Sequence, residues 1–419
     1  MAQEARDEAR NQFKRAEENY KDAQRLLYQS IAQSMAVKSL SIEDNNLKGA
    51  LAQQAKTFFD EYQGRHYDPY IYNGLYAATA DFIGREYNTI PRLHRNAVRT
   101  IAVANNGTNY FTTGTQGKLV KSTTDDQSNN VSLFSNQFPN RALSINSNDE
   151  WLAIASDSSY IQVVNTQTNT SNKIAGHKGY VNDVEFGNNK SEFYSTGSDR
   201  SIRLNNIESL SSEILLNTQF ELKAIDINSS SNLLIAGTIE GNLMLYDLNN
   251  KSETIIYTNP GVPIQSVQFS PDDKLIVFGD EKGVIHVMNA SSKAIQYELV
   301  GHKGRVSTIA FSPDNKLMAS GSFDGVIQMW PVKELGELPI RITDNDAYVW
   351  DIKFSSDSQY IISACADGDV RLWPTNPDKF SDQLCEYIQR NMTEEEWNTY
   401  VGDDIKYRAT CVNLLVEDY

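Results

Sequence analysis

Histidine, serine and aspartate recur together at one spacing in two parts of the sequence. The two sets are His177, Ser195 and Asp199, and His302, Ser320 and Asp324. A histidine beside a carboxylate and a hydroxyl could act as an acid or base in catalysis. Both histidines, however, lie in the same tetrapeptide, Gly-His-Lys-Gly, which begins at Gly176 and again at Gly301. Because a repeated motif indicates a repeating structural unit, we expect these histidines to be structural.

The two copies are separated by three periods of about 42 residues, and His94 lies about two such periods before His177. Each period holds short alternating apolar segments bounded by Gly, Pro or Asp, a pattern typical of β-strands and turns. The pattern is clearest between Gly301 and Trp330, where Ser312-Pro313-Asp314 forms one of the turns. Seven such units can be traced between residues 88 and 375.

This period, with Gly-His early and tryptophan late, resembles the WD40 repeat family over about two-thirds of the chain. The resemblance implies an all-β body, a seven-bladed WD40 β-propeller over residues 86–375, with residues 1–85 and 376–419 as helical additions. The repeat begins within a blade, and the ring must close without a free edge. We therefore expect Glu86–Leu93 to supply the outermost strand of the seventh blade.

The resemblance also implies a buried chain of hydrogen bonds that links aspartate, histidine, serine and the tryptophan N–H. The sixth unit alone has the full set: His302, Ser320, Asp324 and Trp330. The third unit has Asn205 in place of the tryptophan, beside His177, Ser195 and Asp199. The seventh has Asn345 in place of the histidine, beside Ser363, Asp367 and Trp373. Blades without the set must rely on apolar packing, so we expect the first and second to be the most irregular.

The first 85 residues favour helices. No Gly or Pro occurs from Ala2 to Ser41, and the composition strongly favours helix. We expect helices over 2–41, 47–62 and 69–83, with Asp44 and the pair Asp68-Pro69 as start signals. The opening stretch, Ala2 to Asp22, is highly charged, which is typical of a solvated helix or the end of a coiled coil.

Three segments of this region resemble a helical linker of bacterial STAND-type signalling proteins: Ala32–Leu40, Leu47–Ala55 and Tyr67–Tyr76. In that family the linker joins an effector and NTPase region to a C-terminal WD40 propeller. The sequence contains no Gly-x-x-x-x-Gly-Lys-Ser/Thr phosphate loop, so the chain resembles the sensor part alone. The alternative is that the three helices are a packing collar for the propeller.

Residues 376–419 resemble the helical tail of the same proteins. Thr393 and Glu396 have the spacing of a capping box that opens a short helix. Cys385 and Cys411 belong to the matching pattern; they could form a disulfide, or remain thiols in a reducing compartment. Cys365 lies in a blade strand and is expected to fill the core.

Other potentially reactive residues favour structural interpretations. Pairs of carboxylates fall in predicted turns: Asp125-Asp126, Asp272-Asp273 and Asp403-Asp404. Neither a metal-binding spacing of histidine and cysteine nor a Gly-x-Ser-x-Gly nucleophile motif is present. We therefore expect no enzyme activity, catalytic residue, metal or cofactor.

The charge balance constrains the partners. The chain has 54 acidic and 38 basic residues and a net charge of −16. Nucleic acids and anionic membranes require clustered Lys and Arg, so this balance disfavours both. No apolar run approaches the roughly 20 residues that span a bilayer. We expect a cytoplasmic protein without membrane insertion.

A propeller presents loops on a rigid scaffold, which suits recognition. Family geometry implies that the residues just before each innermost strand crown one face, the top face. The expected partner-binding residues there are Arg141, Tyr180, Glu221, Arg305, Tyr348 and Trp350, flanked by Ala97 and Pro263. Arg, Tyr and Trp often dominate binding energies. For Tyr348 and Trp350 the alternative is packing between blades.

The sequence thus predicts a non-catalytic protein–protein interaction module. We expect it to act as a sensor or scaffold in a bacterial signalling or defence-type assembly, with a protein partner such as a fused or separate STAND-type NTPase or effector. One alternative is a stand-alone scaffold assembled through its N-terminal helix. A further alternative is a propeller hydrolase with an unrecognised site.

Overall fold

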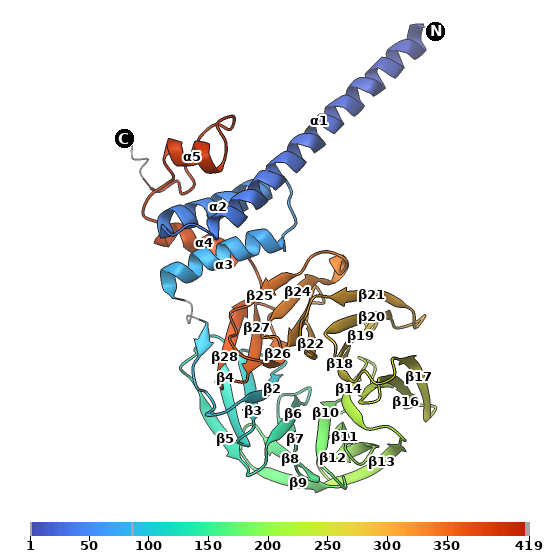
Figure 1. Ribbon diagram of the computed structural model, residues 1–419. Coiled ribbons are helices and arrows are strands. Elements are labelled where there is room, and N and C mark those ends of the chain that lie inside the picture. Colours follow the sequence, from blue (N-terminus) through green and yellow to red (C-terminus); the bar gives the residue numbers. More distant parts are fainter. Residues whose placement is uncertain (1, 85–87, 415–419) are drawn as a thin grey trace. The chain divides into compact units, whose positions relative to one another are not determined.

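The computed structural model describes residues 2–84 and 88–414, and the chain divides into two compact units (Figure 1). One unit is Asn88–Thr375. The other combines the N-terminal helical residues with the residues from Asn376 onward.

Seven four-stranded antiparallel sheets form the unit Asn88–Thr375, and Figure 1 shows them arranged in a ring. The first four blades, each written from its innermost strand outward, are β2 (Val98–Val103), β3 (Asn109–Gly114), β4 (Lys118–Thr123) and β5 (Val131–Ser135); β6 (Asn140–Ile145), β7 (Trp151–Ser156), β8 (Tyr160–Asn165) and β9 (Ser171–Ala175); β10 (Val181–Phe186), β11 (Glu192–Gly197), β12 (Ser201–Asn206) and β13 (Ser211–Asn217); and β14 (Leu222–Ile227), β15 (Leu233–Thr238), β16 (Asn242–Asp247) and β17 (Ser252–Thr258).

The last three blades follow the same order. They are β18 (Ile264–Phe269), β19 (Leu275–Asp280), β20 (Val284–Asn289) and β21 (Ile295–Val300); β22 (Val306–Phe311), β23 (Leu317–Ser322), β24 (Ile327–Pro331) and β25 (Ile340–Ile342); and β26 (Val349–Phe354), β27 (Tyr360–Cys365), β28 (Val370–Pro374) and β1 (Thr89–Ile90). The predicted seven-bladed propeller is therefore confirmed.

Burial changes from the second strand of each blade to the outermost strand. All six residues of β23 are buried, whereas β17 has four exposed residues in a row. A strand that lies between two neighbouring sheets is covered on both faces, so it needs a nearly continuous apolar run rather than alternation. The apolar runs in the sequence thus mark the strands that pack between blades.

The ring closes through β1, which pairs antiparallel with β28. Thr89 lies opposite Arg371, and Ile90 lies opposite Val370. The predicted closure by Glu86–Leu93 is confirmed for these two residues, while residues 86 and 87 lie outside the described part of the chain. The N-terminal end of the propeller thereby completes the seventh sheet and covers the edge of β28.

The expectation that the first and second blades are the most irregular is wrong. Both have four strands of five or six residues, and the shortest strands, β1 and β25, belong to the seventh and sixth blades. Apolar side chains pack between the first two blades, among them Phe111, Leu119 and Leu152. His94 also donates to or accepts from Thr112 at 2.9 Å. Apolar packing together with polar contacts such as this one is sufficient for regular sheets.

The second unit contains five helices among the described residues: α1 (Ala2–Ser39), α2 (Asn45–Glu61), α3 (Pro69–Ile83), α4 (Asp378–Tyr387) and α5 (Glu394–Tyr400). Asp44 caps α2 by accepting the Leu47 N–H, and Asp68 caps α3. Thr393 and Glu396 form the predicted capping box of α5. These helices begin where the sequence places their cap residues.

The C-terminal helices share a core with the N-terminal helices. The Phe58 and Trp397 rings meet edge to face at 6.0 Å, and Tyr72 meets Phe380 at 5.4 Å. Cys385 and Cys411 form a disulfide in this unit, whereas Cys365 is buried and free in the propeller. No helix among the described residues is both long enough and apolar enough to cross a bilayer.

Candidate functional site

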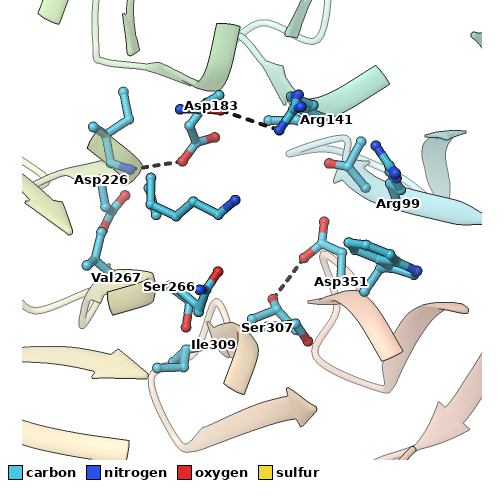
Figure 2. A pocket seen from close by; sticks show the side chains of 18 of the residues that line it. Arg99, Arg141, Asp183, Asp226, Ser266, Val267, Ser307, Ile309 and Asp351 are labelled. Carbon is cyan, nitrogen blue, oxygen red and sulfur yellow. Dashed lines mark hydrogen bonds between the residues drawn. The ribbon is translucent and has the colours of Figure 1, made fainter. Parts of the chain in front are cut away.

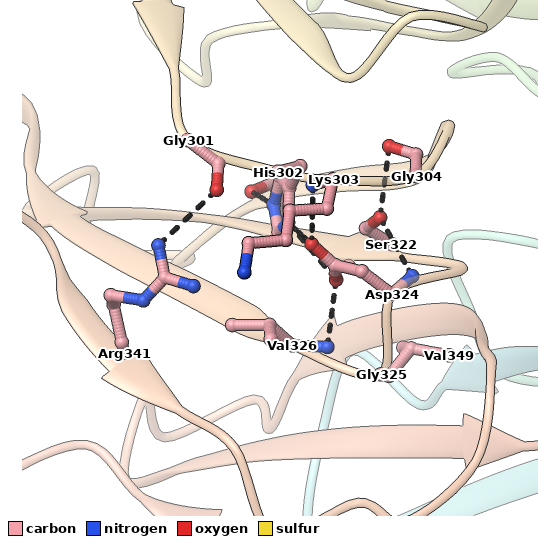
Figure 3. A network of polar contacts seen from close by, with 12 residues as sticks. Gly301, His302, Lys303, Gly304, Ser322, Asp324, Gly325, Val326, Arg341 and Val349 are labelled. Carbon is pink, nitrogen blue, oxygen red and sulfur yellow. Dashed lines mark hydrogen bonds and ion pairs between the residues drawn. The ribbon is translucent and has the colours of Figure 1, made fainter.

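The sixth blade holds a buried polar network around His302 (Figure 3). His302 Nε2 lies 2.8 Å from Ser320 Oγ, and His302 Nδ1 lies 3.2 Å from Asp324 Oδ2. The same carboxylate accepts the N–H groups of Lys303 and Val326. Burial opposes ionisation of Asp324, but these donors outweigh it and lower its pKa to about 2. The network joins the loop before β22 to the turn after β23.

The third blade has an equivalent network. His177 Nδ1 lies 2.9 Å from Asp199 Oδ1, and His177 Nε2 lies 2.9 Å from Ser195 Oγ. Asn205 Nδ2 donates to the same Ser195 oxygen at 2.9 Å. The donor expected from tryptophan is thus supplied by an amide, which has an N–H of suitable position. The third unit lacks the tryptophan of the sixth, yet Asn205 supplies the third blade with a donor that the sequence interpretation did not assign to it.

The seventh blade uses a different acceptor. Trp373 Nε1 donates to Ser363 Oγ at 3.0 Å, and that hydroxyl donates to Asn345 Oδ1 at 3.3 Å. Asp367, expected in this network, instead accepts from Arg371 Nη2 at 2.8 Å. The physical reason is that the Asn345 Nδ2 group donates to the Gly325 carbonyl at 3.1 Å, so Asp367 receives no hydrogen bond from this position. In the sixth blade, Trp330 lies in the apolar cluster between blades with Met318 and Leu335.

Replacing His302 with alanine is expected to lower the free energy of unfolding of the propeller by about 1–3 kcal/mol, because Asp324 and Ser320 lose a buried partner. Urea unfolding followed by tryptophan fluorescence measures the change. Lys303→Ala is the matched control, since its exposed side chain lies outside the network while its N–H remains. An equal loss in both variants would contradict a role for the imidazole.

The seven innermost strands surround a cavity of about 200 Å³ (Figure 2). Its wall contains basic and aromatic residues near the start of these strands and carboxylates deeper along them. A second cavity of about 420 Å³ adjoins the other ends of the strands, and Glu185, Asp226 and Lys353 line both. The first cavity therefore combines an outer basic zone with an inner acidic zone.

Four basic residues form what we call the cationic rim: Arg99, Arg141, Lys223 and Arg305. The Arg305 guanidinium lies 3.7 Å from the centre of the Phe323 ring, and that of Arg99 lies 4.9 Å from the Trp350 ring. Burial lowers the pKa of Lys223, and the nearby charges of Arg141 and Arg305 lower it further. The rim cations are thus close enough to repel one another.

Four acidic residues form the channel carboxylates: Asp183, Glu185, Asp226 and Asp351. Three of them accept a backbone N–H from the next blade: Asp183 from Ile225 at 2.9 Å, Asp226 from Phe269 at 2.6 Å and Asp351 from Ile101 at 2.8 Å. These bonds fasten neighbouring inner strands together. Such fastening keeps the walls of the cavity in fixed positions.

Burial raises the pKa of all four channel carboxylates, that of Asp183 to about 7. Lys353 faces the same group. Its own burial lowers the Lys353 pKa, but the attraction of the carboxylates, led by Asp351, outweighs this and raises it. The inner zone therefore gains protons as the pH falls from 8 towards 5.

The structure gathers the sequence-predicted binding residues around the mouth of this cavity. Arg141, Arg305 and Trp350 line it. Tyr348 is 55% exposed and stacks on Phe323 at 4.9 Å, while the guanidinium of Arg141 lies 4.3 Å from the Tyr180 ring. The surface around the cavity mouth therefore presents aromatic rings beside positive charges.

Two of the predicted binding residues, Glu221 and Arg141, lie elsewhere than expected. Glu221 does not line the cavity, but its charge acts on Lys223 at the rim. Arg141 was expected just before its strand; it is instead the second residue of β6, the position that Arg99 occupies in β2. This register is the signal that could have identified Arg99, Lys223 and the channel carboxylates, which the sequence interpretation missed.

The site contains no evident metal centre. Among residues 2–84 and 88–414, no group of three or more His, Cys, Asp or Glu side chains is arranged to hold a metal ion. The histidine sets of the third and sixth blades are buried within their sheets, with His302 and His177 side chains 0% and 1% exposed. These histidines are therefore enclosed by the blades in which they lie.

A known repeat family matches the sequence in the three blades that contain these polar networks. The family model WD40, described as WD domain, G-beta repeat, matches residues 168–206, 293–331 and 336–374. Each matched segment contains one of the three networks, those of the third, sixth and seventh blades. Among curated proteins, no match to the sequence is found.

Proposed function

Because this chain has WD40 repeats at three positions of a seven-bladed β-propeller, a fold that suits protein interaction, we propose that it recognises a protein partner through its top face. The observation that carries this proposal is the exposed group around the cavity mouth. Tyr180 and Tyr348 are 40% and 55% exposed there, each in contact with an arginine or an aromatic neighbour. Such residue types supply much of the energy of protein interfaces.

Preorganisation of the mouth supports the same function. Arg305 is held against Phe323, and Phe323 meets Trp350 edge to face at 4.6 Å. Arg141 is held by an ion pair with Asp157. Side chains that are already ordered lose less conformational entropy when a partner binds. A partner would therefore meet a surface that needs little rearrangement.

The proposal includes a biological context, which is a signalling or defence-type assembly. The resemblance of Ala32–Leu40 and Leu47–Ala55 to a STAND-type linker supports a sensor or scaffold role in a signalling or defence-type assembly. A cytoplasmic location follows from the sequence interpretation, whereas the disulfide between Cys385 and Cys411 favours an oxidising compartment.

One observation favours scaffold assembly through α1 as a second candidate function. Phe13, Tyr20 and Leu27 are 71%, 63% and 57% exposed and recur at heptad spacing along α1. Residues at this spacing occupy one of the two core positions of a coiled-coil heptad. Removal of residues 2–25 would abolish self-association if this seam is used, and would leave it unchanged otherwise; sedimentation velocity distinguishes the two results.

Affinity capture from a lysate of the source organism tests top-face recognition. The bait is the full chain, either unchanged or with alanine at Arg141, Tyr180, Arg305 and Tyr348. We expect the altered bait to lose a protein that the unchanged bait captures, because the shared interface is removed. A matched bait has alanine at exposed residues away from the mouth: Lys190, Lys251 and Tyr297.

The matched bait should retain the captured protein, and circular dichroism should show all three baits folded alike. A partner that all three baits retain would place recognition on the N-terminal helices or the tail instead. Loss of the partner from both altered baits would indicate a general effect of surface truncation.

A further inference from the structure

We propose that the cationic rim binds the carboxylates of an acidic segment of the protein partner, with one side chain entering the cavity. This inference rests on the proposed recognition through the top face and specifies the chemistry of the partner. It is carried by the charge of the rim, by unpartnered donors in the cavity wall and by the size of the cavity.

The charge of the rim contrasts with that of the chain. The whole protein has a net charge of −16, yet four cations converge on this one mouth. Of these, Arg141 is paired with Asp157, whereas no ion pair joins Arg99, Lys223 or Arg305 to a carboxylate among the described residues. An anionic ligand at the mouth would relieve their mutual repulsion.

The channel carboxylates do not neutralise the rim. Asp183 and Asp226 direct oxygens to the backbone N–H groups of the next blade, and Asp351 accepts from Ile101 and Thr308. The lysine that interacts with all four carboxylates is Lys353, deeper in the channel. The basic zone therefore remains available to a group from outside.

Two hydrogen-bond donors in the cavity wall lack acceptors. Arg99 Nε and Trp350 Nε1 are buried and have no hydrogen-bond partner among the described residues. Both groups can only donate. Because a buried donor without an acceptor is costly, an acceptor that reached either N–H group would be stabilised there. A carboxylate has acceptor oxygens and the charge that complements the surrounding cations.

The dimensions and surroundings favour a protein segment over a nucleic acid. A cavity of about 200 Å³ accepts a side chain or a few waters. Glu221 and Glu281 act on Lys223, so the positive charge is confined to the mouth and does not continue as the series of phosphate contacts that nucleic acids need. Exposed Tyr348 lies beside the mouth, where it can contact apolar atoms of a peptide. An acidic peptide with an adjacent aromatic residue fits these features.

Isothermal titration calorimetry of the full chain with the peptide acetyl-Glu-Glu-Trp-Glu-Glu-amide tests the inference. We expect binding that the Gln-Gln-Trp-Gln-Gln analogue does not show. Lys223→Gln and the double variant Arg99→Gln with Arg305→Gln should each raise the Kd by about tenfold or more. Lys190→Gln with Lys251→Gln removes two exposed charges outside the cavity wall and should leave the Kd within about twofold.

Three outcomes would overturn the inference. The acidic peptide does not bind, the glutamine analogue binds equally well, or the rim variants bind like the control variant. Sodium acetate, inorganic phosphate and a thymidine oligonucleotide are titrated in parallel. A small anion that binds as tightly as the peptide would assign the rim to a free anion, and tighter binding of the oligonucleotide would assign it to nucleic acid.

The same variants distinguish a failure of acidic-segment binding at the rim from a failure of top-face recognition. If capture of the cellular partner is abolished by the four alanine substitutions but unaffected by Lys223→Gln and by the Arg99 and Arg305 variant, the top face recognises a partner without acidic contacts. If the rim variants lose both the peptide and the cellular partner while their unfolding curves match the unchanged protein, both inferences stand together.

Discussion

Replacing Ile90 with alanine is expected to lower the free energy of unfolding of the propeller by about 2–5 kcal/mol. Ile90 is 5% exposed and packs in one cluster with Val98 and Val370. It forms half of β1, the strand that closes the ring against β28. Truncation leaves a cavity at this closure and weakens the cover over the edge of β28. Urea unfolding measures the effect.

Thr89→Ala provides the matched control, because Thr89 belongs to the same strand but is only partly buried. Its substitution should cost less than about 1 kcal/mol. If both substitutions cost the same small amount, β1 contributes little to stability and the propeller is held by its other six sheets. If both cost several kcal/mol, the backbone pairing of β1, rather than the burial of Ile90, carries the closure.

The contribution of the channel carboxylates to the stability of the propeller is expected to decrease as the pH rises from about 4 to about 8. Below about pH 6.5 the buried His94, whose pKa burial lowers to about 4, acts in the opposite direction. In the unfolded chain, Asp and Glu side chains have a pKa of about 4. In the folded chain, burial raises the pKa of Asp183 to about 7 and also raises the pKa of Glu185, Asp226 and Asp351. The folded state therefore holds more protons in this interval, and unfolding becomes easier as they leave.

The size of this effect follows from linkage. A tenfold difference in proton affinity between the folded and unfolded states changes the free energy of unfolding by about 1.4 kcal/mol. Asp183 and Glu185 lie beside a cavity and keep part of their surface accessible, so we expect about 1–3 kcal/mol for the group rather than the full sum. Below about pH 4 the trend reverses, because Asp199 and Asp324 have a pKa of about 2 and lose their stabilising charge on protonation.

Urea midpoints between pH 5 and pH 8 test the expectation. Asp183→Asn with Glu185→Gln should flatten the pH dependence and increase stability at pH 8, since both amides stay neutral. Glu213→Gln with Glu253→Gln removes two exposed carboxylates from the outermost strands β13 and β17 and should preserve the slope. An unchanged slope in the Asp183 and Glu185 variant would show that these groups are not the source.

Elements that depend on local or periodic patterns could be predicted from the order of the residues. The spacing of His177 and His302 to their serines and aspartates indicated the repeat, because each of these two blades places a loop against its own turn. Asp44 and Thr393 marked helix starts, since capping depends on residues a few positions away. Such contacts lie within one blade or one helix, so they are visible in the order of the residues.

The side chains that meet on the propeller axis could not be predicted in this way. Arg99, Lys223 and Arg305 lie on different blades, and nothing in any single repeat shows that their charges share one mouth. The raised pKa of Asp183 likewise depends on burial by several inner strands. Asn205 donates where a tryptophan was expected because its amide N–H lies within hydrogen-bond distance of Ser195 Oγ. The candidate site arises from convergence of distant segments, and only the closed ring brings them together.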